Sequence, residues 1–202
     1  MNRNPHDPAT RLLTPRTLVL FAMIGFAAGY RLVVHFLPGL LPWNFTPVEA
    51  MALFGGAYFA DRRWAILAPL AAMAVADGVI ALSLPAAQVR DWVTIAPIIY
   101  ACIALTAFAG FALRGRARPL NIAIAAGASA TGFFVVTNFF VWLGSGMYAA
   151  SLSGLTACYV AGLPFYQYGS LPGTLLWSAI LFGGFALLSR RYTMLAAAPA
   201  TA

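Results

Sequence analysis

Charge is the scarcest property of this sequence. Only 8% of its 202 residues are charged, against about a quarter in soluble globular domains, while 62% are hydrophobic and the mean hydropathy is +0.83. A chain with so little charge cannot cover a water-facing surface, which excludes a soluble globular domain. Because about 20 apolar residues cross a bilayer, six crossings would use about 120 residues and leave too few for a separate soluble domain.

Lysine is absent, and all twelve basic residues are arginines. The missing lysine excludes a Walker A phosphate loop and Schiff-base chemistry on a lysine amine. Two histidines (His6, His35) and two cysteines (Cys102, Cys158) are not expected to supply a closed zinc site or a cysteine-ligated iron–sulfur cluster unaided. We therefore expect no ATP hydrolysis, no resident metal and no cofactor in this chain.

Long apolar runs predict an all-α membrane protein with six transmembrane helices. The predicted spans are Thr17–Leu37, Thr46–Ala60, Trp64–Leu84, Trp92–Leu113, Leu120–Leu143 and Leu171–Ser189. The second run is the shortest, and we expect it to borrow flanking residues or to span at a tilt. The chain then divides into a basic tail (1–16), a six-helix domain (17–189) and a C-terminal tail (190–202).

The arginines lie almost entirely on one side of the predicted bundle. Ten fall in the two tails and in the second and fourth connections, whereas only Arg90 falls on the opposite side and Arg31 lies inside the first span. Positive residues mark cytoplasmic loops, so we expect a protein of the cytoplasmic (inner) membrane with both termini in the cytoplasm. The net charge of +7 then reflects topology and not nucleic-acid binding. A cleaved signal peptide in residues 1–30 is disfavoured, because the apolar run continues through Leu37.

The connections on the other side are longer, and the longest is Gly144–Ser170. It is aromatic, glycine-rich and uncharged, and loops of this length in compact proteins are usually functional or disordered. Its apolar content favours a short re-entrant or interfacial helix around Ser153–Ala161. On the same side, the sequence Thr46-Pro47-Val48-Glu49 predicts a capping box that begins the second helix at the outer interface.

Five polar side chains inside the predicted spans converge on one depth. Ionisable groups cost about 2.5–3.5 kcal/mol each at the centre of a spanning helix and suggest a functional site. With a rise of 1.5 Å per residue, Arg31 and Asp77 both lie about 20 Å from the cytoplasmic ends of their helices, in the outer third of the bilayer. We expect the floor of an outward-facing pocket under an aromatic roof that includes Trp43, Phe165, Tyr166 and Tyr168. The predicted substrate-binding residues are Arg31, His35, Asn44, Glu49, Asp77, Asn138, Tyr148 and Tyr159.

A structural interpretation of the same residues stays open. Arg31 could neutralise Asp77 or Glu49 as a buried bridge, and Glu49 could act only as a helix cap. Aromatic side chains at this depth also form ordinary interfacial belts.

Two stripes of small residues follow the first two predicted helices. Ala22, Gly25 and Gly29 form the first, and Ala52, Gly56 and Ala60 form the second. Such ladders let helices approach closely, either within one bundle or against another membrane protein. The first stripe is the candidate surface for docking a partner.

Catalysis inside the membrane is not expected. Ser129 lies toward the cytoplasmic half of its predicted span, whereas His35 lies toward the outside. A serine nucleophile needs hydrogen-bond contact with its base, which this difference in depth disfavours.

Four segments resemble a family of uncharacterised bacterial six-helix membrane proteins, which is in turn similar to the substrate-binding S components of energy-coupling-factor (ECF) vitamin transporters. The segments are NFTPVEAMALFGGAYF (44–59), APLAAMAVAD (68–77), TGFFVVTNFFVWL (131–143) and MYAASLSGLTACYVAGLPF (147–165). The resemblance implies an S-component-like bundle of six helices with both termini inside and a pocket formed largely by outer loops.

The same resemblance implies a function and partners. S components capture a micronutrient and then associate with a separate transmembrane scaffold and cytoplasmic ATPases, through small residues on the first helix. We therefore expect binding and uptake of a small molecule of the vitamin or metal-micronutrient class, with the lipid bilayer and an ECF scaffold as further partners. The alternative is a structural or assembly protein of the membrane without a transport ligand.

Overall fold

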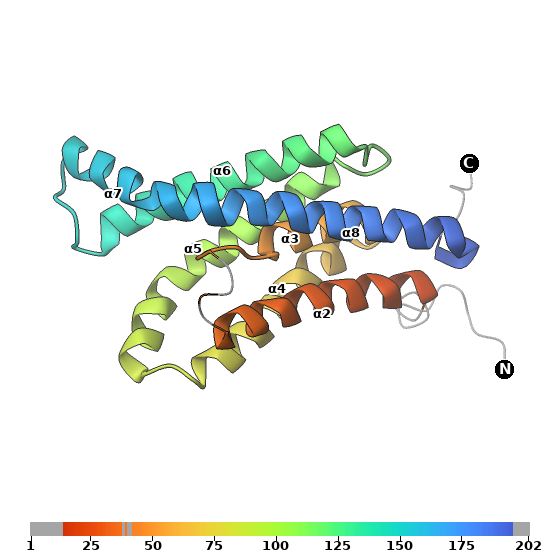
Figure 1. The fold of residues 1–202 in the computed structure, drawn as a ribbon, viewed down its shortest axis with the longest axis horizontal. Coiled ribbons are helices and arrows are strands. Elements are labelled where there is room, and N and C mark those ends of the chain that lie inside the picture. Colours follow the sequence, from red (N-terminus) through yellow and green to blue (C-terminus); the bar gives the residue numbers. More distant parts are fainter. Residues whose placement is uncertain (1–13, 38, 40–41, 196–202) are drawn as a thin grey trace.

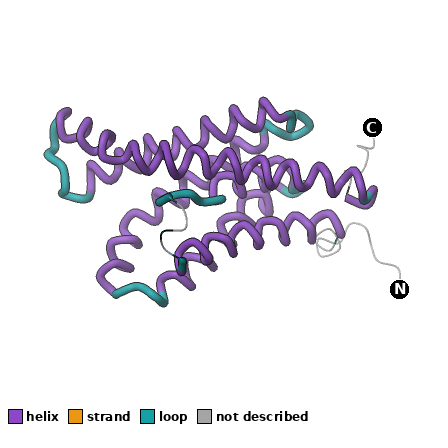
Figure 2. Tube along the Cα trace, in the orientation of Figure 1, coloured by secondary structure: helices purple, strands orange, loops and turns teal. Residues whose placement is uncertain are grey.

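The computed structural model describes residues 14–37, 39 and 42–195, and within these residues the chain is helical without strands (Figure 2). The all-α prediction is therefore confirmed. The elements are α2 (Pro15–Phe36), α3 (Val48–Tyr58), α4 (Arg62–Ala81), α5 (Ala86–Phe111), α6 (Pro119–Gly144), α7 (Leu152–Phe165), the π-helical turn η1 (Tyr166–Ser170), α8 (Leu171–Arg191) and the 3-10 turn η2 (Thr193–Leu195). Most of the two predicted tails, 1–16 and 190–202, lies outside the described residues.

The long helices run along a common axis, and the short helix α3 lies between them (Figure 1). The start of α2 and the end of α8 lie at one end of the bundle, together with the loop between α5 and α6. Two helices that begin at this end have side-chain N-caps. Thr14 caps α2 by accepting a hydrogen bond from the backbone N–H of Thr17, and Asp61 caps α4 by accepting one from the backbone N–H of Arg63. We call this the arginine-rich end, and we call the opposite one, which the sequence predicts to face outward, the outer end.

Five helices in the described part of the chain are long and apolar enough to cross a membrane. They are α2, α4, α5, α6 and a 40-residue unit, Leu152–Arg191, in which α7, η1 and α8 follow one another without a break. The predicted count of six is not confirmed, because Thr46–Ala60 forms only the 11-residue α3. Such a helix is about 16 Å long, roughly half the thickness of the hydrocarbon core.

Helix α3 is the centre of the bundle. All nine residues from Val48 to Gly56 are buried, and the helix packs against α4, α5 and α8. It comes closest to α5, because a Cβ atom on Gly56 would lie 2.1 Å from the carbonyl oxygen of Ala107. The second small-residue stripe therefore serves packing inside the bundle at Gly56.

The predicted capping box at Thr46–Glu49 does not form. Pro47 is the N-cap of α3, no side chain caps that end, and Glu49 is buried. The chain enters the bundle between Trp43 and Thr46, beside η1 and the start of α8. Glycines make this approach feasible, since a Cβ atom on Gly169 would lie 1.9 Å from the carbonyl oxygen of Trp43.

The expected long loop Gly144–Ser170 is mostly helical. Only Ser145–Ser151 separates α6 from α7, and Ser151 caps α7 by accepting a hydrogen bond from the N–H of Gly154. The short helix expected around Ser153–Ala161 is present, but it extends into η1 and α8. Pro164 removes one backbone donor near its end, and the π-helical turn that follows carries the helix past this defect.

Candidate functional site

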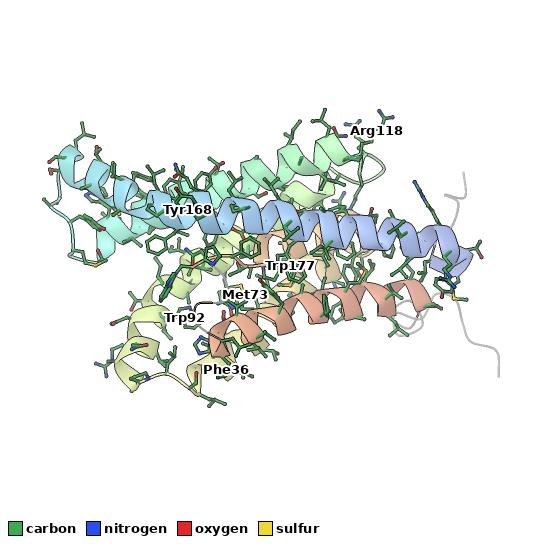
Figure 3. All side chains as sticks on the ribbon, viewed as in Figure 1. Phe36, Met73, Trp92, Arg118, Tyr168 and Trp177 are labelled. Atoms are coloured by element: carbon green, nitrogen blue, oxygen red, sulfur yellow. The ribbon has the colours of Figure 1, made fainter. Side chains whose placement is uncertain are left out.

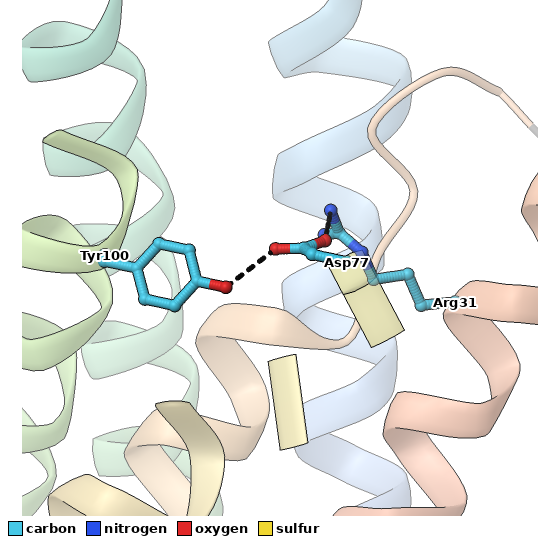
Figure 4. A network of polar contacts seen from close by, with 3 residues as sticks. All are labelled: Arg31, Asp77 and Tyr100. Carbon is cyan, nitrogen blue, oxygen red and sulfur yellow. Dashed lines mark hydrogen bonds and ion pairs between the residues drawn. The ribbon is translucent and has the colours of Figure 1, made fainter. Parts of the chain in front are cut away.

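A polar network of Arg31, Asp77 and Tyr100 joins α2, α4 and α5 inside the bundle (Figure 4). Arg31 Nη2 lies 2.5 Å from Asp77 Oδ1, and the Tyr100 hydroxyl donates a hydrogen bond of 3.0 Å to Asp77 Oδ2. Both carboxylate oxygens of Asp77 are therefore engaged. The side chain of Asp77 is only 4% exposed, whereas that of Arg31 is 22% exposed, so the guanidinium is the more accessible charge of the pair.

Beside this network lies a cavity of about 310 Å³. It is bounded by α2, α4, the start of α5 and the segment that leads into α3. Four of the predicted binding residues reach it: Arg31, His35, Asn44 and Asp77. Its other lining residues are Val34, Trp43, Thr46, Ile80, Ala81, Leu84, Val89 and Trp92. The cavity thus combines a charged floor with indole and aliphatic walls, and Figure 3 shows Trp92 at the outer part of the bundle.

His35 is oriented by α4. Its Nε2 atom lies 3.0 Å from Ser83 Oγ, and the Ser83 hydroxyl donates its hydrogen to the carbonyl oxygen of Ile80 at 2.7 Å. Because that hydroxyl hydrogen is used, we assign Nε2–H as the donor to Ser83. In the neutral imidazole, Nδ1 is then the acceptor.

Glu49 lies deeper than the cavity and does not line it. Glu49 is only 3% exposed and lies on the helix that packs against α4, α5 and α8. Among the described residues, the ion pair of Arg31 is with Asp77 and not with Glu49. The Nε atom of Arg31 is buried and has no hydrogen-bond partner.

The other predicted residues lie apart from the cavity, between α6 and α7. Asn138 Nδ2 donates to the carbonyl oxygen of Phe134 at 2.9 Å, and the Tyr159 hydroxyl donates to that of Val135 at 2.8 Å. Tyr148 lies in the short loop before α7 and does not line the cavity. Of the expected aromatic roof, Trp43 lines the cavity, whereas Phe165, Tyr166 and Tyr168 do not.

Sequence reasoning missed Tyr100, Ser83 and Trp92. Tyr100 carried a usable signal, because a tyrosine within a long apolar span needs a hydrogen-bond partner for its hydroxyl. In the sequence, Trp92 is only the first residue of a predicted span, and nothing there marks it as part of a binding site. Ser83 lies two residues after the end of α4, and a polar residue just beyond a helix does not by itself indicate a binding site.

The first small-residue stripe faces an apolar groove between α2 and α4 of about 390 Å³. Gly25 and Gly29 line it opposite alanines of α4, and a Cβ atom on either glycine would meet nothing within 4 Å. Ala22 is exposed on the same helix but does not line the groove. Unlike Gly56, these glycines are not used for close packing inside the bundle.

Within the described residues, no group of three or more histidine, cysteine, aspartate and glutamate side chains could hold a metal ion. Cys102 and Cys158 are buried free thiols. Cys158 donates a hydrogen bond from its thiol to the carbonyl oxygen of Asn138, which ties α7 to α6.

An all-helical bundle with five helices long and apolar enough to cross a membrane is the pattern of a multi-span helical membrane protein. The chain belongs to the family of unknown function DUF6580, whose model matches residues 11–198. No curated protein and no solved structure matches it. The family carries no functional description, so the comparisons leave the resemblance to S components without independent support.

Proposed function

We propose that this protein captures a small molecule in the 310 Å³ cavity and takes part in its uptake across the membrane, as S components do. The observation that carries the proposal is the juxtaposition of Arg31, His35 and Asn44 with two indoles around one open cavity. Its volume is at the lower limit of small-molecule sites, about 300–1,000 Å³, and its mixture of apolar walls with a few polar groups is typical of them.

The accessible charge suggests which part of a ligand would be recognised. Asp77 has both oxygens occupied, whereas Arg31 retains N–H donors, one of them buried and unpaired. A guanidinium pairs best with a carboxylate or another strong acceptor. We expect the ligand to place such a group near Arg31 and its apolar part against Trp43 and Trp92.

The proposed orientation places the cavity outside the cell. The loop between α5 and α6 carries Arg114, Arg116 and Arg118, and the end of α8 carries Arg190 and Arg191, all at the end of the bundle opposite the cavity. The bias of arginine toward cytoplasmic loops supports a cytoplasmic location for that end and for both termini in the inner membrane.

The groove between α2 and α4 is the proposed surface for a partner such as an ECF scaffold. Its glycine and alanine lining would allow a partner helix to approach closely. Transport in this scheme needs energy from such a partner, and this chain contributes binding without covalent chemistry.

A structural role is the second candidate. It is favoured by the saturation of Asp77, whose two oxygens are bonded to Arg31 and Tyr100 within one described bundle. In that case the network joins α2, α4 and α5, and the cavity holds only water.

Native mass spectrometry of the full chain, purified in mild detergent, tests the proposal. We expect a co-purified small molecule on the wild type and on Arg90→Ala, which removes an exposed arginine that does not line the cavity. We expect Arg31→Ala to lose it. Equal retention by Arg31→Ala and Arg90→Ala would refute the assigned pocket, and absence of any small molecule from all three proteins would favour the structural role.

A further inference from the structure

A second, larger cavity lies at the arginine-rich end, away from the outer cavity. Its volume is about 960 Å³. Two arginines reach it from different elements, Arg16 from the first turn of α2 and Arg114 from the loop after α5. Between them lie apolar and aromatic side chains and four side chains that carry a hydroxyl; the lining includes Leu20, Tyr58, Phe185, Ala186 and Ser189.

Both guanidinium groups are fixed by backbone carbonyls. Arg16 donates to the carbonyl oxygens of Leu195 at 2.7 Å and Tyr58 at 3.4 Å. Arg114 donates from Nε to that of Gly56 at 2.9 Å and from Nη2 to that of Phe59 at 2.8 Å. The two arginines therefore hold the C-terminal end of α3, where carbonyl groups lack helical partners.

Within the part of the chain that the structure describes, these contacts leave the positive charges of both guanidinium groups uncompensated. Within the described residues the ion pair is that between Arg31 and Asp77, at the other end of the bundle, so no described carboxylate lies within 4.0 Å of Arg16 or Arg114. Burial, together with the neighbouring charge of Arg62, lowers the pKa of Arg114. Each guanidinium has five N–H groups and donates two of these hydrogen bonds, so donors remain on both. The buried Ser189 hydroxyl on the cavity wall also lacks a partner.

The place and lining of the cavity indicate the chemistry of an occupant. The arginines lie at one end of helices that are apolar enough to cross a membrane, the level at which lipid headgroups would meet the protein. The buried side chains of Leu20 and Phe185 form the apolar inner wall of the cavity, and the exposed Ala186 continues its lining onto the surface of α8. A soluble phosphate would use the guanidinium groups but leave the apolar walls in contact with water. A phospholipid satisfies both parts, and basic pockets between membrane helices on the cytoplasmic side are known to bind anionic headgroups.

We propose that the cavity around Arg16 and Arg114 is a binding site for an anionic phospholipid. The phosphate lies against the two guanidinium groups, and the acyl chains leave the cavity past the exposed Ala186 on α8. The lipid supplies the counter-ion that the described residues lack and secures the end of α3, the helix that carries Glu49. The site is independent of the proposed capture of a small molecule at the outer end.

Native mass spectrometry with added lipid tests the site. The full chain in mild detergent is mixed with phosphatidylglycerol or with phosphatidylcholine of the same acyl chains. An arginine near an anionic headgroup contributes about a factor of five in affinity, so we expect a preference for phosphatidylglycerol of roughly 25-fold from the pair. Equal binding of the two lipids would overturn the proposal, and so would displacement of phosphatidylglycerol by inorganic phosphate, which would identify a soluble anion as the ligand.

Charge-matched variants separate the cavity from the general basicity of this end. The double variant Arg16→Gln, Arg114→Gln should lose the preference. The double variant Arg118→Gln, Arg190→Gln removes the same charge from exposed positions outside the cavity and should keep it; Figure 3 shows Arg118 projecting from the bundle. Equal loss in both would mean that a diffuse positive surface attracts the lipid, and the proposed site would be wrong.

A second pair of variants leaves the arginines intact, in case their loss unfolds α3. Ala186→Trp fills the cavity from α8, whereas Leu187→Trp places the same indole on a neighbouring, 66% exposed position outside it. We expect only Ala186→Trp to reduce retention of phosphatidylglycerol, while any small molecule bound at the outer end is retained by both. Equal lipid retention by both variants would contradict the site, whatever the outcome at the outer cavity.

Discussion

Substitution of Tyr100 tests how much the polar network contributes to the stability of the protein. Its hydroxyl donates one hydrogen bond to Asp77 inside the bundle. Tyr100→Phe should lower the free energy of unfolding by about 1 kcal/mol, because Asp77 then loses a buried donor. Thermal unfolding in detergent measures the change. Tyr168→Phe removes a hydroxyl from a 66% exposed side chain and should have no effect; an equal effect of the two variants would contradict the role assigned to Tyr100.

The height of single polar residues along the bundle could be predicted from the sequence, but the neighbouring helix that each side chain faces could not. Arg31 and Asp77 were placed at the same height from the helical rise, and the structure brings them together as an ion pair. Asn138 was placed at nearly the same height but faces α7, where Gly162 makes room for its side chain. The face that a side chain presents within a bundle depends on the packing of distant helices, which height alone does not determine.

Close helix packing at Gly56 leads to a prediction about the contact between α3 and α5. Gly56→Ala should destabilise the protein by about 1–3 kcal/mol, because the added methyl group meets the backbone of α5 at Ala107. Gly25→Ala makes the same change where a Cβ atom has open space and should be neutral or stabilising by up to about 1 kcal/mol. Chemical or thermal unfolding compares them. A Gly56→Ala protein as stable as Gly25→Ala would refute the close contact.

The segment 43–46, by which the chain enters the bundle beside η1, leads to a second prediction. Gly169→Ala should displace the chain at Trp43, because the new Cβ atom would collide with its carbonyl oxygen, and Trp43 and Asn44 line the outer cavity. Retention of the outer ligand should fall, as measured by native mass spectrometry. Gly183→Ala, on α8 with nothing within 4 Å, is the control. If Gly169→Ala retained the small molecule as well as the wild type does, residues 43–46 would not contribute to the outer site.

Hydropathy predicted the positions of helices well but not the place of each in the bundle. The run Thr46–Ala60 is apolar because α3 is surrounded by protein, whereas the other runs owe much of their hydropathy to surfaces that would face lipid. Composition does not distinguish these two environments. The continuity of α7 with α8 could not be predicted, because Pro164 and the neighbouring glycines are typical of a loop. The π-helical turn that keeps the helix continuous there has no clear signal in the sequence.

The direction of the whole molecule in the membrane is a separate prediction. In a background with Cys102→Ala and Cys158→Ala, we expect Gln88→Cys, at the start of α5, to react with a membrane-impermeant maleimide on intact cells. Arg118→Cys, at the opposite end, should react only after the cells are permeabilised. The reverse pattern would place the candidate pocket on the cytoplasmic side and exclude capture from outside.

The bundle as a whole has a polar cavity at one end, an arginine-lined cavity at the other, and α3 between them. Membrane insertion and the bias of arginine could be predicted from composition alone, because both depend on totals along the sequence. The cavities could not, since each is assembled from elements far apart in the chain. The sequence marks Arg16 and Arg114 only as indicators of topology, whereas in the structure they donate hydrogen bonds to carbonyl oxygens of α3, at Tyr58 and Gly56.

The most direct test of small-molecule capture is to fill the outer cavity while the ion pair between Arg31 and Asp77 stays in place. Ala81→Trp introduces an indole into the cavity, and Leu82→Trp introduces one at the adjacent, 89% exposed position outside it. Native mass spectra of the two full-length proteins, purified in parallel, should show the co-purified small molecule on Leu82→Trp and not on Ala81→Trp. Retention of the same molecule in equal amounts by both variants would contradict capture at this cavity.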